Sequence, residues 1–344
     1  MKSKKKKLTA FAFVFLLFAG AFAGYKFYEY FYAPNTNIVA ADFFYIPTGS
    51  NIDDVFNMLE KQNIVVDMSS FKRAAGFLKF NSAKAGRYKI TKRMGNREFI
   101  SMLRSGNQSA IKITFSGNIR SNEKIASIAA RYLETDSTSI IEALNDNDFI
   151  GKFGFNSQTV IGMFIPNTYE IYWNISANDF IERMYREYEK FWNDSRKSKL
   201  RQTGFTQADV SIIASIVYEE TNNIDEMPVI AGVYINRINA GMLLQADPTV
   251  KFALGDFSIR RILIRHTAYD SPYNTYKYKG LPPSPICMPS IAAIDAVLNY
   301  EHHDYYYFCA KDDFSGKHNF AKTLSQHNQN ARAYQRALNS RNVR

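Results

Sequence analysis

An uncharged apolar run near the N-terminus most strongly limits how this 344-residue chain can fold. Residues 8–24 (LTAFAFVFLLFAGAFAG) carry no charged side chain, and five of the seven residues before them are lysine. A helix needs about 20 apolar residues to cross a bilayer, and the aromatic residues that follow extend the run to that length. The sequence therefore predicts a basic cytoplasmic tail at residues 1–7 and one transmembrane helix at residues 8–28, with the rest of the chain exported.

The same run also suits a cleaved signal peptide, because its second half contains the small residues Ala19, Gly20, Ala21 and Ala23. No cysteine lies within or directly after the run, so a lipid-modified cysteine does not anchor the chain there. Without the five N-terminal lysines the formal net charge of +11 falls to about +6, which indicates only a weak preference for an anionic partner. The dense basic residues lie beside the apolar run, so the charge does not predict nucleic-acid binding.

After a short linker the chain has the pattern of a mixed α+β protein in two parts. Residues 42–114 predict a small module of short strands and helices. Ser50 and Asp53 match a capping box at the start of its first helix. A strand, IKITF, marks the boundary with a larger α+β domain at residues 115–344, whose first part, residues 115–195, is predicted to form a bridging region.

The most informative segment is the helix predicted at residues 206–223 (TQADVSIIASIVYEETNN). Thr206 and Asp209 match a capping box at its start. At about 100° per residue, Glu220 falls inside the apolar arc of the helix, whereas Glu219 falls at the edge and is expected to reach water. Burial against apolar groups raises the pKa of a carboxyl, as a general acid near neutral pH requires. A structural ion pair with an arginine is the alternative interpretation of Glu220.

The remaining motifs give no indication of metal or cofactor chemistry. His302 and His303 are adjacent and point apart, and the chain contains no HExxH pair, GxSxG elbow, P-loop or dinucleotide-binding fingerprint. We therefore expect no metal and no cofactor. Cys287 and Cys309 lie in apolar runs, so two separate buried thiols are favoured over a disulfide.

Seven segments carry longer motifs, at residues 46–65, 85–90, 164–172, 214–221, 233–255, 273–290 and 304–328. In this order, over essentially the whole chain, they resemble the YceG-like endolytic murein transglycosylases, the MltG family. The acid of that family is the second Glu of an E-x-E-T stretch, which falls on Glu220 in ASIVYEET. The first Glu of the stretch is replaced by Tyr218, and Glu219 matches a variable position. The sequence also departs at residues 115–118 (FSGN), where relatives usually carry an acidic residue.

The resemblance implies a bacterial inner-membrane (cytoplasmic-membrane) enzyme with a LysM-like subdomain at residues 42–114 and an extracytoplasmic catalytic domain at residues 115–344. Glu220 would protonate the MurNAc–GlcNAc bond of peptidoglycan glycan strands and then act as base, which leaves a 1,6-anhydro end. The alternatives are a hydrolytic muramidase that uses Asp247 with Glu220 and a peptidoglycan-binding scaffold without activity. Peptidoglycan synthases are further expected partners. The side chains expected to bind the substrate are Gln245, Asp247, Thr249, Asn274, Thr275, Tyr276 and His318.

Overall fold

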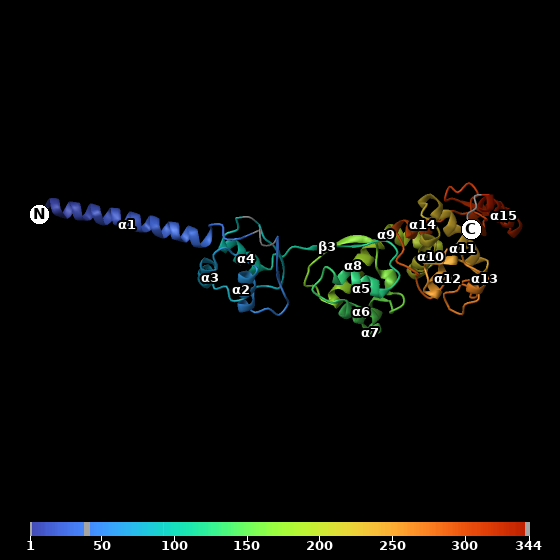
Figure 1. Cartoon of the computed structure of the whole chain (residues 1–344), viewed down its shortest axis with the longest axis horizontal. Coiled ribbons are helices and arrows are strands. Elements are labelled where there is room, and N and C mark those ends of the chain that lie inside the picture. The colour runs from blue at the N-terminus through green and yellow to red at the C-terminus, as the bar shows by residue number, and fades with distance from the viewer. Residues whose placement is uncertain (1, 38–41, 92, 341–344) are drawn as a thin grey trace. The chain divides into compact units, whose positions relative to one another are not determined.

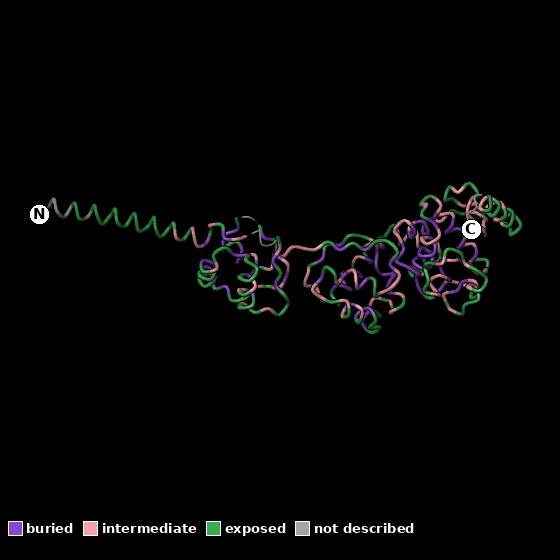
Figure 2. The backbone as a smooth tube through the Cα atoms, viewed as in Figure 1, coloured by how far each residue is buried: buried purple, intermediate pink, exposed green. Residues whose placement is uncertain are grey.

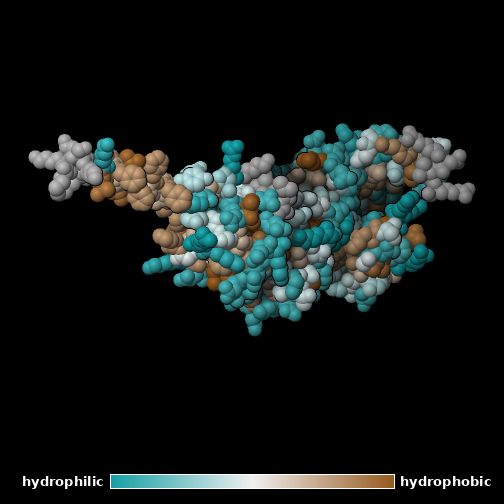
Figure 3. Space-filling model, turned by 60° about the vertical axis from the view of Figure 1, so that its left-hand side comes forward, coloured by the Kyte–Doolittle hydropathy of each residue, from teal (hydrophilic) through white to brown (hydrophobic). Residues whose placement is uncertain are grey.

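The computed structural model describes residues 2–37, 42–91 and 93–340 (Figure 1). The first element, α1 (Lys2–Phe31), is one continuous helix, and Ala10–Phe31 within it is long and apolar enough to cross a membrane. Figure 2 shows the helix as exposed over most of its length, and Figure 3 shows that the residues along this apolar stretch are mostly hydrophobic. The predicted span at residues 8–28 thus corresponds to a candidate membrane helix that continues to Phe31.

The chain separates into two compact units, and each is described by itself. Two short segments that the sequence analysis placed in the bridging region are part of the first unit. Unit 1 consists of Met1–Lys112, Tyr132–Glu134 and Glu170–Ile175, and unit 2 consists of Ile113–Arg131, Thr135–Tyr169 and Ser176–Arg344.

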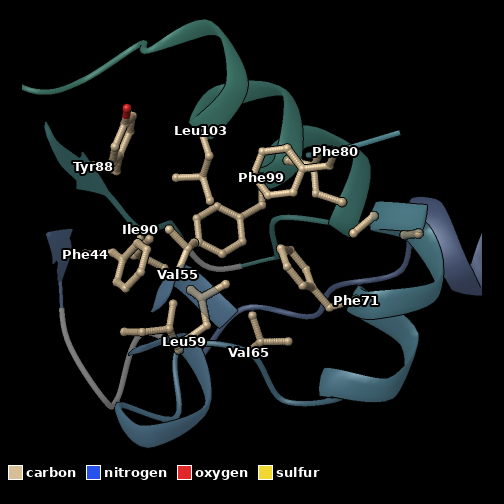
Figure 4. Packing of buried hydrophobic residues seen from close by; sticks show 14 of the residues in the cluster. Phe44, Val55, Leu59, Val65, Phe71, Phe80, Tyr88, Ile90, Phe99 and Leu103 are labelled. Atoms are coloured by element: carbon tan, nitrogen blue, oxygen red, sulfur yellow. The ribbon is translucent and has the colours of Figure 1, made fainter. Parts of the chain in front are cut away.

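Unit 1 contains a small α+β module built on one antiparallel pair of strands. β1 (Phe43–Ile46) pairs with β2 (Gly86–Lys89), and Phe44 lies opposite Tyr88. Figure 4 shows that side chains from these strands and from the neighbouring helices, such as Phe99, point into one apolar core. Burial of these large side chains is the main term that stabilises the module. Its helices are α2 (Ile52–Lys61), α3 (Met68–Phe77) and α4 (Asn96–Ser105).

Helix α2 begins one residue later than the sequence analysis predicted. Asn51, not Ser50, is the N-cap, because its side-chain oxygen accepts hydrogen bonds from the backbone N–H groups of Asp53 and Asp54. Asp54 completes the capping box by accepting from the backbone of Asn51 at 3.0 Å. Asparagine and serine cap helices equally well, so the local rule allows both registers. The likeness of this module to a LysM domain stays a prediction.

Unit 2 is mostly helical, so the whole chain is of mixed α+β class, as predicted. Strand β3 (Ile111–Phe115) pairs with β4 (Asn167–Ile171), and β5 (Tyr307–Ala310) pairs antiparallel with β6 (His318–Ala321). Its first helices are α5 (Asn122–Ala130), α6 (Ser137–Asn145), α7 (Asn147–Ile150), η1 (Gly151–Phe153), η2 (Val160–Met163), α8 (Ala177–Phe191) and α9 (Asp194–Thr203). Its later helices are α10 (Gln207–Glu220), η3 (Ile224–Glu226), α11 (Met227–Asn239), α12 (Asp247–Leu254), α13 (Ile264–Thr267), α14 (Ile291–Leu298) and α15 (Leu324–Ser340).

Helix α10 is the central helix of the C-terminal part of unit 2. Every side chain of residues 210–217 is buried, because α11, α12 and α14 all pack against this helix. The polar Ser215 is accommodated there, since its hydroxyl donates to the carbonyl of Ile212 at 2.7 Å and accepts from the N–H of Ile286 at 3.0 Å. A helix buried on all sides has little freedom to move, so the residues at its C-terminal end are held in place.

Candidate active site

Glu220 is the last residue of α10, and its side chain lines a cavity of about 390 Å³. The helix begins as the sequence predicted, with Thr206 as N-cap and Asp209 completing the capping box. It ends at Thr221, where the backbone becomes extended. The other residues that line the cavity are Tyr234, Arg237, Leu244, Gln245, Asp247, Tyr276, Tyr307, Phe308, Cys309, Ala310, His318, Leu324 and His327.

The carboxyl group of Glu220 accepts a hydrogen bond from the hydroxyl of Tyr234 on α11, with 2.6 Å between the two oxygens. Burial raises the pKa of Glu220 from 4.5 to about 7, and the hydrogen bond from Tyr234 acts against this rise. The charge of Asp247 raises the pKa further, and the charge of Lys251 lowers it. The raised pKa that the helical arc predicted is therefore confirmed. Such a carboxyl can donate a proton near neutral pH and then accept one.

Glu219 is mostly buried in an ion pair, whereas the sequence analysis expected this neighbouring carboxylate to reach water. Its side chain is 14% exposed and accepts two hydrogen bonds from Nη2 of Arg120, at 2.7 and 2.8 Å. The guanidinium group lies over the ring of Phe257, 4.2 Å from its centroid. The prediction failed because neighbouring elements surround α10, and the edge of the apolar arc is not a boundary with solvent. The ion pair considered for Glu220 is formed by Glu219 instead.

Asp247 is the second acidic side chain at the cavity. It is the first residue of α12, and its Oδ1 accepts a hydrogen bond from the hydroxyl of Tyr276 at 2.5 Å. Burial and this hydrogen bond raise the pKa of Tyr276 far above its usual value, so the phenol stays protonated and remains a donor. Both residues thus line the same cavity as Glu220, and their contact with the substrate stays a prediction.

Arg237, which the sequence analysis missed, is a buried cation beside the cavity. Its guanidinium group donates to three backbone carbonyls at 2.6 to 3.1 Å and to Oε1 of Gln245 at 3.2 Å. These bonds hold the loop in which Gln245 adopts a left-handed backbone conformation, with φ of 52°. An arginine in the last turn of an otherwise apolar helix was the available signal, because buried arginines are rare unless they are paired.

His318, in β6, is held in the cavity wall by Glu226. The backbone N–H of His318 donates to Oε1 of Glu226 at 2.9 Å, and Nδ1 lies 3.1 Å from Oε2. Its ring also makes an edge contact with Phe308. The rings of Tyr307 and His327, which also line the cavity, are stacked with centroids 5.5 Å apart. His318 thus lines the cavity, and its contact with the substrate stays a prediction. Its partner Glu226 was not predicted from the sequence.

Three predicted substrate-binding residues lie below the cavity surface instead of lining it. Thr249 and Asn274 are fully buried and Thr275 is 2% exposed. The hydroxyl groups of Thr249 and Thr275 lie 2.8 Å apart, and the amide of Asn274 donates to two backbone carbonyls. Their polar atoms bond within the protein because they join the loop of Tyr276 to the start of α12. They therefore position Tyr276 and Asp247, and the expectation of direct substrate contact is corrected.

Both cysteines are free thiols. Cys287 is buried as predicted, and burial raises the pKa of its thiol well above the usual value. Cys309 is only half-buried and lines the cavity, because strand β5 forms part of the cavity wall. The described residues include no group of three or more His, Cys, Asp or Glu side chains placed to hold a metal ion.

The fold and the cavity define a site of the acid/base class: one half-buried carboxyl of raised pKa among tyrosine hydroxyls and aromatic rings, in a cavity of the size that small-molecule sites have. The sequence profile of the YceG-like family matches residues 44–333, and the chain belongs to this family.

The chain is similar to the endolytic murein transglycosylase of Bacillus subtilis (strain 168), with 29% identity over 86% of this chain and 85% of that protein. It is 27% identical to the endolytic murein transglycosylase of Streptococcus pneumoniae serotype 2 (strain D39), over 83% of this chain and 57% of that protein. A crystal structure of a yceG-like protein from Listeria monocytogenes is 28% identical with a TM-score of 0.55, and the match covers 83% of this chain and 98% of that chain.

Proposed function

We propose that this chain is an endolytic lytic transglycosylase that cuts the glycan strands of peptidoglycan, with Glu220 as its one acid and base. The observation that carries the proposal is the carboxyl of Glu220, which has a pKa of about 7 and faces a cavity of about 390 Å³. The ion pairs of the described chain do not include this carboxyl. Membership of the YceG-like family supports the substrate class, because the matched relatives are named endolytic murein transglycosylases.

The reaction needs a single carboxyl that changes its protonation state. Protonated Glu220 donates its proton to the glycosidic oxygen between MurNAc and GlcNAc, and the bond from this oxygen to C1 of MurNAc breaks. The carboxylate of Glu220 then removes the proton from the 6-hydroxyl of MurNAc, whose oxygen closes on C1. The products are a 1,6-anhydro-MurNAc end and a free GlcNAc hydroxyl, and no water is consumed. Glu220 ends protonated and ready for the next cleavage.

Side chains around Glu220 support this role by position and charge. Tyr234 fixes the carboxyl group through its 2.6 Å hydrogen bond. Asp247 lines the same cavity, and its negative charge favours the positive charge that develops at C1 in an oxocarbenium-like transition state. Gln245, Tyr276 and His318 supply polar groups at the cavity wall that can bind sugar hydroxyl or N-acetyl groups.

A hydrolytic muramidase is the second candidate, because Asp247 is a second carboxylate in the cavity of Glu220. Hydrolysis commonly uses two such groups, one as acid and one as nucleophile or base. Against this, the carboxylate of Asp247 is already engaged by Tyr276 at 2.5 Å. The family relatives are named transglycosylases, which favours the first candidate.

We also propose that α1 anchors the chain in the cytoplasmic membrane in a single pass, with unit 2 on the extracytoplasmic side. Its apolar stretch Ala10–Phe31 follows the lysines of the N-terminus, and positively charged ends stay in the cytoplasm. This places the catalytic site on the side of the membrane where peptidoglycan lies. Association with peptidoglycan synthases stays a prediction from the resemblance.

The masses of the products decide between the two reactions. The full chain in detergent is incubated with purified peptidoglycan sacculi, and the released fragments are separated and weighed by mass spectrometry. We expect fragments that end in 1,6-anhydro-MurNAc, each lighter by one water than the corresponding hydrolysis product. Fragments with reducing MurNAc ends would establish a hydrolase, and the absence of any fragment under conditions that keep the protein folded would favour a binding protein.

A further inference from the structure

A second large cavity lies in unit 1, at the base of α1. It has a volume of about 480 Å³ and is lined by Phe31 and Tyr32, where the candidate membrane span ends, and by Arg93, Arg97 and Glu98 around the start of α4. The cavity has no part in the chemistry of Glu220, which belongs to unit 2. Its position directly after an apolar span sets it at the level where lipid headgroups meet water.

The end of α1 is fixed tightly to the wall of this cavity. A Cβ atom at Gly95 would lie 2.8 Å from the backbone oxygens of Phe31 and Tyr32, so only glycine permits this close approach. The neighbouring Asn96 is buried, and its amide donates to the carbonyl of Tyr30 at 2.8 Å. The end of the membrane helix therefore packs directly against the residues that line the cavity.

Two arginines, Arg93 and Arg97, line the cavity. Arg97 donates to the hydroxyl of Tyr32 at 2.6 Å, and its guanidinium group lies 5.7 Å from that ring. Arg93 lies on the rim of the cavity and is exposed. In the described chain neither arginine forms an ion pair, although the carboxylate of Glu98 lines the same cavity. Two cations against one anion leave the cavity with a net positive charge.

An apolar side chain beside the same joint indicates contact with the bilayer itself. Phe77, at the end of α3, is 81% exposed, and its ring packs edge-on against Phe31 with centroids 5.8 Å apart. Arg73 in the same helix donates to the hydroxyl of Tyr30 at 2.9 Å. Exposed aromatic rings next to arginines are typical of the membrane–water interface, where the rings meet acyl chains and the cations meet phosphates.

We propose that the cavity at the base of α1 binds the phosphate headgroup of an anionic phospholipid from the membrane that α1 spans, and that Phe77 contacts the adjoining acyl region. Arginine suits this ligand because its planar guanidinium group donates two parallel hydrogen bonds to phosphate oxygens. The proposal rests on the membrane anchoring proposed above and is independent of the reaction at Glu220. The bound lipid fixes unit 1 against the bilayer and so sets where the chain emerges from the membrane.

The test uses the full chain, purified in a neutral detergent, and native mass spectrometry to count retained lipid. Phosphatidylglycerol is compared with zwitterionic phosphatidylethanolamine and with inorganic phosphate as a competitor. We expect retention of phosphatidylglycerol at least tenfold above that of phosphatidylethanolamine, and at least a tenfold weaker retention in the double variant Arg93→Ala, Arg97→Ala. The matched control is Lys61→Ala, Lys89→Ala, which removes two exposed charges of the same unit away from the cavity and leaves retention unchanged.

Equal retention by wild type and the arginine variant, or displacement of the lipid by millimolar inorganic phosphate, would overturn the proposal. Thermal unfolding of the variant shows that it is folded, and its release of fragments from sacculi in detergent is expected to equal that of wild type. A failure of lipid retention with normal cleavage rejects only the lipid site. A failure of cleavage with normal lipid retention rejects only the proposed enzyme function.

Discussion

Removing the hydroxyl group of Tyr234 tests how the protonation of Glu220 is controlled. This hydroxyl donates to the carboxyl at 2.6 Å and lowers the pKa of Glu220 against the effect of burial. A hydrogen bond to a charged group contributes about 1.5–3 kcal/mol of stabilisation. The protonated carboxyl keeps part of this stabilisation, so the bond favours the ionised form over the protonated form by about 1.4 kcal/mol. Because one pKa unit equals about 1.36 kcal/mol, the pKa of Glu220 in Tyr234→Phe rises from about 7 to about 8.

The assay is the pH dependence of kcat/KM with purified glycan strands. Glu220 must be protonated to start the reaction, so kcat/KM falls as the pH rises through its pKa. We expect the alkaline limb of the Tyr234→Phe profile to lie about one pH unit above that of wild type. The control is Tyr169→Phe, which also removes a buried hydroxyl bonded at 2.6 Å, in that case to a backbone carbonyl. An alkaline limb of Tyr234→Phe at the wild-type pH or below it would show that the Tyr234 hydroxyl does not lower the pKa of Glu220.

Two further predictions concern stability. Glu220→Gln should be more stable than wild type by up to about 3 kcal/mol at pH 8 and equally stable near pH 4. The reason is that burial raises the pKa of Glu220 from 4.5 to about 7 in the folded protein, so wild type loses stability as the pH rises from 4.5 through about 7. Gly232→Ala in α11 should lower stability by about 1–3 kcal/mol, because its Cβ would lie 2.4 Å from the carbonyl oxygen of Glu301 and 2.7 Å from Nε2 of His303.

Thermal unfolding followed by circular dichroism measures both effects. For Glu220→Gln, a stability difference that does not change between pH 4 and pH 8 would show that burial does not disfavour the ionised form of the Glu220 carboxyl. For Gly232→Ala, the control is Gly76→Ala in α3, where an added Cβ meets nothing within 4 Å. This control should be stabilised by up to about 1 kcal/mol, because alanine favours the helix over glycine. Stabilisation of both glycine variants would contradict the packing of α11.

The features that were predicted best from the sequence are those that follow from the local rules of helix formation. The capping box of Thr206 and Asp209 and the apolar residues after it predicted α10, and the position of Glu220 on that helix predicted its raised pKa. These features depend on residues close together in the chain, so one sequence is enough to find them. The shift of the α2 cap to Asn51 shows the limit of such rules, because two adjacent residues can serve as cap.

The surroundings of the site could not be predicted in the same way. Whether Glu219 meets water or Arg120 depends on a segment 99 positions away, and the partner of His318 is Glu226, 92 positions away. Thr249 was expected to bind the substrate, yet its hydroxyl bonds to another buried side chain. Such pairings are set by tertiary packing, which leaves no pattern in the local sequence.

Comparing the activities of Glu220→Gln and its neighbour Glu219→Gln on purified sacculi tests whether Glu220 is the acid of the reaction. Both variants replace one carboxyl group at the end of α10 by an amide, but only the first removes the carboxyl at the cavity. We expect that Glu220→Gln stays folded and releases no 1,6-anhydro fragments, whereas Glu219→Gln releases them. Release of anhydro fragments by Glu220→Gln at a rate close to wild type would contradict the assignment of the acid and with it the proposed mechanism.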